Sequence, residues 1–187
     1  HCQSWSEGPQ GGTPGRANTS SIPLPEPIVF QVQHNPLIPA PGDEIQVTCK
    51  VESVGPLSTV ILFHRNDGDP TFGQSIMEKG VDGFYRADLG PGEQGDILEF
   101  VVQAVAESGA EGRFPVDAPA RSAVLQVDAN DYPNDLPLYR IVMRRALEQE
   151  LYARNVYSNE QLDACFYAGG RVYYNVGVRF RGKGSRH

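Results

Sequence analysis

Short apolar runs separated by turn-forming residues dominate residues 28–127. In several runs the apolar side chains fall at every second position, which is the spacing of one face of a β-strand. The run "STVILFHR" is almost wholly apolar, as is typical of a central strand. The predicted strands lie at 28–33, 44–52, 58–65, 83–89, 97–107 and 121–127. This spacing predicts a sandwich of about seven strands, of the immunoglobulin or fibronectin type.

The same alternation predicts which side chains face the core of the sandwich. The predicted set is Ile45, Val47, Cys49, Val51, Tyr85, Ala87, Leu89, Leu98, Phe100, Val102 and Ala104. Cys49 lies where a first inter-sheet cysteine would be found, but the later strand offers Val101 and Val102. We therefore interpret Cys49 as a small buried apolar residue.

The pattern changes after residue 127. Residues 128–136 are polar and interrupted by proline, which is typical of a linker. We then expect a strand at 137–143, a helix at 144–158 with Leu147 and Leu151 on one face, and a β-hairpin at 162–180 that turns at Gly169-Gly170. A unit of about 50 residues buries too little surface to be stable alone, so we expect 137–187 to be the start of a larger domain. The predicted fold class is mainly β: a sandwich followed by a truncated α+β unit in the order β-α-β-β.

Charge divides the chain in the same place. The net charge is −7, yet residues 137–187 hold nine Lys and Arg against four acids, and the rest holds seven against nineteen. Opposite charges on the two parts indicate two modules. The overall acidity argues against nucleic acid as the partner of the whole chain. No apolar run reaches the roughly 20 residues of a membrane-spanning helix.

The C-terminal run "GVRFRGK" matches the G-x-x-x-x-G-K core of a phosphate-binding loop. Such a loop follows a strand, opens a helix, and has Ser or Thr after its lysine. Here Gly184 follows Lys183, and the residues from Val178 to Arg181 alternate like a strand. The pattern therefore disfavours a phosphate loop. An arginine-lined strand that binds nucleic acid is an alternative, and a solvated edge of a truncated domain is the interpretation we favour.

Two other groups of residues carry side chains with potential chemistry. The linker carries Asp128, Asp131 and Asp135, whose oxygens are weak candidates for calcium, and the stretch is similar to the calcium-binding linkers of cadherins. A solvated linker is the favoured alternative. The histidines are dispersed, Cys165 lies in a predicted strand as a buried thiol, and no catalytic residue is assigned.

The segment from "LPLYRIVM" to "YYNVGVRFRGKGSR" resembles the opening of the CotH kinase-like family, which comprises secreted or spore-coat proteins with an atypical kinase fold. The positions that match are Leu136, Pro137, Tyr139, Arg140, Val176, Gly177, Val178, Arg179, Arg181, Gly182, Ser185 and Arg186. Lys183-Gly184 departs from the Asn-Ser that is usual in the family. In addition, "SWSEGPQGGTPGRAN" looks like the end of a lamin-tail-like domain, so residues 1–27 are interpreted as its tail plus a linker.

The resemblance implies a secreted or cell-surface bacterial protein whose parent transfers phosphate from ATP, with Mg²⁺, to protein Ser or Thr. Extracellular or coat proteins would be its partners. It also implies that Arg179, Arg181, Gly182, Lys183 and Ser185 form the rim of the nucleotide pocket. The family's phosphate-binding lysine and metal-binding aspartates lie downstream of this segment, so we expect this chain to need no cofactor and to be inactive. The alternative is a non-catalytic extracellular module in which the sandwich is a spacer or adhesion domain.

Overall fold

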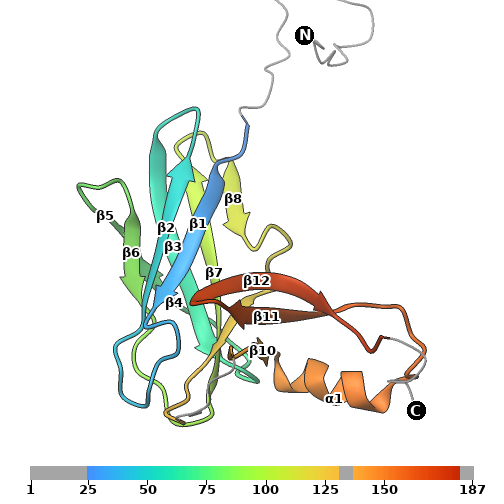
Figure 1. The fold of residues 1–187 in the computed structure, drawn as a ribbon. Coiled ribbons are helices and arrows are strands. Elements are labelled where there is room, and N and C mark those ends of the chain that lie inside the picture. The colour runs from blue at the N-terminus through green and yellow to red at the C-terminus, as the bar shows by residue number, and fades with distance from the viewer. Residues whose placement is uncertain (1–24, 131–136, 182–187) are drawn as a thin grey trace, which may run out of the picture.

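The computed structural model describes residues 25–130 and 137–181 (Figure 1). Within them the chain is mainly β, with a single short helix. In chain order the elements are β1 (Ile28–Asn35), β2 (Gln46–Glu52), β3 (Leu57–Asn66), β4 (Gly73–Ile76), β5 (Glu78–Lys79), β6 (Tyr85–Asp88), β7 (Ile97–Ala106), β8 (Glu111–Phe114), β9 (Ala123–Gln126), β10 (Arg140–Val142), α1 (Arg145–Ala153), β11 (Leu162–Ala168) and β12 (Arg171–Val178).

The strands form three antiparallel sheets. Sheet A has the order β1-β2-β6-β5, and sheet B has the order β4-β3-β7-β8, with β9 also pairing with β7. Sheets A and B enclose a common core and so form a β-sandwich. Sheet C, with the order β10-β11-β12, lies across one side of the sandwich near β9 (Figure 1). We call residues 137–181 the C-terminal unit.

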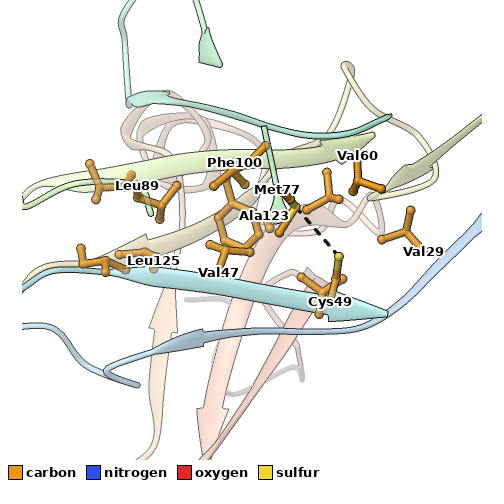
Figure 2. Packing of buried hydrophobic residues seen from close by; sticks show 14 of the residues in the cluster. Val29, Val47, Cys49, Val60, Met77, Leu89, Phe100, Ala123 and Leu125 are labelled. Atoms are coloured by element: carbon orange, nitrogen blue, oxygen red, sulfur yellow. Dashed lines mark hydrogen bonds between the residues drawn. The ribbon is translucent and has the colours of Figure 1, made fainter. Parts of the chain in front are cut away.

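The core of the sandwich is made by the inward-facing side chains of both sheets (Figure 2). Phe100, Leu62 and Ile45 are completely buried in it. Cys49 is also completely buried, and its thiol lies 4.0 Å from the sulfur of Met77. Its interpretation as a small apolar residue is confirmed. Burial of this kind is the main favourable term in folding, at about 25 cal/mol for each Å² of apolar surface removed from water.

The predicted strands of the sandwich are all present, with shifted ends. Strands β4, β5 and β8 were missed because they have only four, two and four residues and no apolar alternation. Strand β8 contains Gly112, and a Cβ atom there would collide with the carbonyl oxygen of Pro27. A glycine therefore lets β8 approach the start of β1 closely.

The C-terminal unit has the predicted order of strand, helix and hairpin. Gly169 and Gly170 form the hairpin turn with φ values of 56° and 72°, a conformation that suits glycine at both positions. The helix ends at Ala153 instead of residue 158. The reason is local: the Asn155 side chain accepts a hydrogen bond from the Tyr157 backbone N–H at 2.9 Å, which competes with continuation of the helix.

Helix α1 covers part of the outer face of sheet C. Leu147 and Leu151 from the helix pack with Met143 against apolar residues of β11 and β12, including Leu162 and Val176. The predicted helical face is thus confirmed. In the part of the chain that the structure describes, no helix is long and apolar enough to cross a membrane.

The opposite face of sheet C packs against the sandwich. Val142, Cys165 and Tyr167 form an apolar cluster with Ile97 and Val124 of sheet B. Strand β7 is buried on both faces over residues 97–102, whereas its alternation predicted burial at every second residue; sheet C covers Ile97, and Val101 lies beside Ala118 and Pro119. The C-terminal unit therefore does not stand apart from the sandwich. It covers a sheet face that would otherwise contact water.

Candidate functional site

The residues predicted to form a nucleotide rim lie at and beyond the end of β12. Arg179 donates a hydrogen bond to the side-chain oxygen of Asn159, and Phe180 packs beside Tyr152 with ring centroids 5.9 Å apart. Arg181 is exposed. Gly182, Lys183 and Ser185 lie outside the described residues, so the rim stays a prediction. The predicted strand alternation from Val178 to Arg181 is wrong, because β12 ends at Val178 and residues 179–181 are not in a strand.

Asp128, one of the three calcium candidates, has protein groups as its partners. Its carboxylate pairs with Arg140 at 2.8 Å and accepts hydrogen bonds from the Gln94 side chain at 2.8 Å and the Asn130 backbone at 3.0 Å. Asp131 and Asp135 lie outside the described residues. Within 25–130 and 137–181, no group of three or more His, Cys, Asp or Glu side chains could hold a metal ion. Asp128 thus joins the linker to the C-terminal unit through Arg140.

Tyr174 is the residue that most directly joins the C-terminal unit to the sandwich. A bulge in β12 near Asn175, which has a φ of 53°, accompanies a register shift opposite Cys165. The ring of Tyr174 meets Phe100 and Phe114 edge to face, with centroids 5.5 and 5.7 Å apart. Edge-to-face contacts of this kind are favourable beyond the area they bury. Strand β12 thereby contributes a side chain to the core of the sandwich.

The hydroxyl of Tyr174 is paired with His34, which is 5% exposed. The distance from His34 Nδ1 to the Tyr174 oxygen is 2.5 Å, and His34 Nε2 lies 3.0 Å from the Leu37 carbonyl oxygen. When Nε2 carries the ring proton and donates it in a hydrogen bond to that carbonyl, Nδ1 is the acceptor of a hydrogen bond from the Tyr174 hydroxyl. Burial lowers the pKa of His34 to about 4, which keeps the ring neutral at physiological pH. Both ring nitrogens are therefore engaged in structural contacts.

A groove of about 450 Å³ runs beside this pair, between β1 and the hairpin turn. Its lining includes Gln33, Asn35 and Thr48 from sheet A and Arg171 and Tyr173 from β12. These are amide, hydroxyl, cationic and aromatic groups. Because His34 is held by Tyr174 and Leu37, it has no free nitrogen with which to serve as a general base in this groove.

A second polar contact lies on the outer face of sheet B. Glu99 is 1% exposed, and its carboxylate is 3.1 Å from Arg65 and 2.5 Å from the Ser122 hydroxyl, which donates to it. Arg144 of the C-terminal unit approaches the same carboxylate at 3.9 Å. A buried carboxylate needs such partners because an unpaired charge in the interior is strongly unfavourable. Glu99 therefore helps to fix the position of the C-terminal unit.

Cys165 lies at the centre of the interface. Its side chain is 1% exposed, and the Val124 backbone N–H donates to its sulfur at 3.4 Å. Burial raises the pKa of this thiol to about 11, so it is neither a thiolate nor accessible in the folded state. The prediction of a buried thiol at Cys165 is confirmed.

Sequence reasoning did not find the pairing of His34 with Tyr174. The two residues are 140 positions apart, and a lone histidine followed by Asn-Pro carries no sign of burial. The sequence did contain one signal, the adjacent tyrosines Tyr173 and Tyr174. Adjacent residues of a regular strand point to opposite faces of the sheet, so one of the two rings is expected on the inner face. The exposed fraction of Tyr173, 48%, shows that it took the outer face.

No protein-family model matches the chain, and no curated protein matches it.

Proposed function

We propose that the chain is a non-catalytic module in which the sandwich serves as a rigid mount for the C-terminal unit. The observation that carries this proposal is the position of Tyr174, which belongs to β12 but packs against Phe100 and Phe114 of the sandwich. Two independent domains joined by a flexible linker would share only a small, polar interface. Here the interface includes an apolar cluster, and the side chains that define it come from both parts.

Charged contacts surround this apolar centre. Arg140 pairs with Asp128, Arg121 pairs with Asp163 at 3.2 Å, and the Asp67 carboxylate accepts a hydrogen bond from the Arg145 backbone at 2.6 Å. Polar contacts of this kind add little free energy where they are exposed, but each restricts orientation. Together they hold sheet C in one orientation on sheet B.

We further infer that the sandwich is of the immunoglobulin type. The order β1-β2-β6-β5 in one sheet corresponds to A-B-E-D of that fold, and β3-β7 followed by β8 and β9 corresponds to C-F-G. Many cell-surface domains share this sandwich architecture, which is compatible with a role as a mount.

Hydrogen exchange on the intact chain tests the mount. We expect the amides through which β11 and β12 pair with each other to open with the same free energy as those of β3 and β7, because the two parts share packing. If the C-terminal unit opens with a much smaller free energy than the sandwich, the two are separate domains and the proposal is wrong.

A second candidate is that the chain is part of a CotH kinase-like protein at the bacterial surface. It is supported by the matched residues and by the order β10, α1, β11 and β12. ATP and Mg²⁺ would belong to the complete domain, since the described residues around Arg179 include no cluster of metal ligands. Incubation of the purified chain with radiolabelled ATP and magnesium tests whether this chain alone transfers phosphate. We expect no phosphate transfer, and clear transfer would place catalysis within this chain.

A further inference from the structure

Strand β12 forms an open edge of sheet C. Within the described residues it pairs only with β11, and residues 171–178 make no other backbone hydrogen bond. The sandwich edges at β4, β5 and β8 have four, two and four residues; β1 has eight, as β12 does, but it lies against β8. An open strand edge presents unpaired N–H and C=O groups to which another strand can add. The bulge near Asn175 leaves a paired stretch on each side of it.

The residues at the two ends of this edge are cationic. Arg171 begins β12, and Arg179 and Arg181 follow its last residue. Among the described residues, Arg171, Arg179 and Arg181 form no ion pair with an acid, although Arg179 contacts the Asn159 amide. By contrast, Arg140 and Arg144 are directed to Asp128 and Glu99 at the interface. The cations beside the open edge therefore remain available to an acidic partner.

A row of aromatic rings leads across sheet C to the same edge. Tyr139 and Phe166 are parallel, with centroids 6.0 Å apart, and Phe166 is 6.2 Å from Tyr173. Tyr139 and Tyr173 are 64% and 48% exposed. A strand added to β12 would place a side chain beside Tyr173 and extend the row, and cross-strand aromatic pairs stabilise a sheet.

We propose that β12 is a docking edge for an extended acidic strand of a partner protein. Its main chain would pair with β12, its acidic side chains would face Arg171 at one end and Arg179 and Arg181 at the other, and an aromatic or β-branched residue would pack on Tyr173. A second copy of this chain is a poorer occupant. Antiparallel pairing of two β12 strands would bring Arg171 of one copy towards Arg179 of the other, and like charges across strands are destabilising.

Fluorescence anisotropy with synthetic peptides tests this proposal on the full chain. The probe is an eight-residue peptide with glutamate near both ends and alternating valine and tyrosine between them. We expect saturable binding that weakens with salt, and about tenfold weaker binding when lysine replaces glutamate. Two further peptides are N-methylated at alternate residues in the two possible registers. One of them should lose binding and the other keep it, because only one edge of the added strand pairs with β12.

Protein variants supply the matching control. Arg171→Glu should weaken binding of the acidic peptide about fivefold or more, whereas Lys79→Glu, an equal change of charge on β5, should leave it unchanged. Hydrogen exchange should show new protection in β12 on binding. The proposal is overturned if the acidic peptide does not bind at millimolar concentration or if both N-methylated peptides bind equally. It is also overturned if sedimentation shows that the chain dimerises and hydrogen exchange shows that β12 is protected in the dimer. This docking proposal is separate from the proposed function as a mount. Peptide binding can fail while the exchange data still show that the sandwich and the C-terminal unit form one rigid structure.

Discussion

Tyr174→Ala is the most informative single change in this protein. It removes the ring that reaches the sandwich core and the hydroxyl that pairs with His34. Tyr173→Ala is a matched control, because it removes the same side chain one position away on the exposed face of the strand.

The expected loss follows from the contacts. Truncation of a fully buried large aromatic residue to alanine destabilises a protein by about 3–5 kcal/mol. Tyr174 keeps some exposure, which lowers this figure, but its removal leaves His34 without a partner for Nδ1, at a cost of about 1 kcal/mol or more. We therefore expect a loss of about 3 kcal/mol for Tyr174→Ala. For Tyr173→Ala we expect about 1 kcal/mol or less, from the lost contact with Phe166.

The chain contains its own reporters for this experiment. Cys165 lies on the face of the C-terminal unit that packs against the sandwich, Cys49 lies in the sandwich core, and both are essentially inaccessible. Alkylation followed by peptide mapping measures how often each site opens. A loss of about 3 kcal/mol corresponds to a rise of about 100-fold in the labelling rate of Cys165. Urea denaturation measures the total loss of stability independently.

Two outcomes would refute the reasoning. If Tyr173→Ala and Tyr174→Ala speed the labelling of Cys165 equally, the ring of Tyr174 does not hold the two parts together. If Cys165 labels rapidly in the unmutated chain while Cys49 stays protected, the C-terminal unit is not fixed to the sandwich at all.

Three further predictions concern charge and metal. The pKa of His34 is about 4 in the folded state and about 6.5 in the unfolded state, so the unfolded state binds more protons between these pH values. The free energy of unfolding should therefore fall as the pH falls through this window, by at most about 1.4 kcal/mol per pH unit. Urea titrations should show a smaller pH dependence for His34→Gln, and an equal pH dependence would contradict the assignment. Glu99→Gln should reduce the free energy of unfolding by about 2 kcal/mol, because Arg65 loses a buried charged partner. The control Glu111→Gln removes an exposed ion pair and should change the same free energy by less than about 0.5 kcal/mol in urea denaturation. Added Ca²⁺ should leave the melting temperature unchanged, because the Asp128 carboxylate is already paired with Arg140; a rise that depends on Ca²⁺ concentration and is absent in Asp128→Asn would establish the metal site.

The long strands were predictable because their side chains carry the pattern locally. Ile45, Val47 and Cys49 alternate with polar residues, and the glycine pair at 169–170 defines a hairpin turn. The short strands β4 and β8 were not predictable, because four residues with a glycine contain no period. Of the candidate site residues, sequence reasoning placed Arg179 within a strand that in fact ends one residue earlier, at Val178, and it could not show that Asp128 pairs with Arg140.

The sequence by itself determined a mainly β chain, the positions of the long strands, the helix with its apolar face, and the buried state of both Cys49 and Cys165. These properties depend on neighbours within a few residues, where periodicity and turn chemistry act. Only the tertiary structure decided that the C-terminal unit covers sheet B, that β7 is buried on both faces, and that Tyr174 meets His34. Those outcomes depend on which surfaces meet across 140 positions of chain, and no local pattern carries that information.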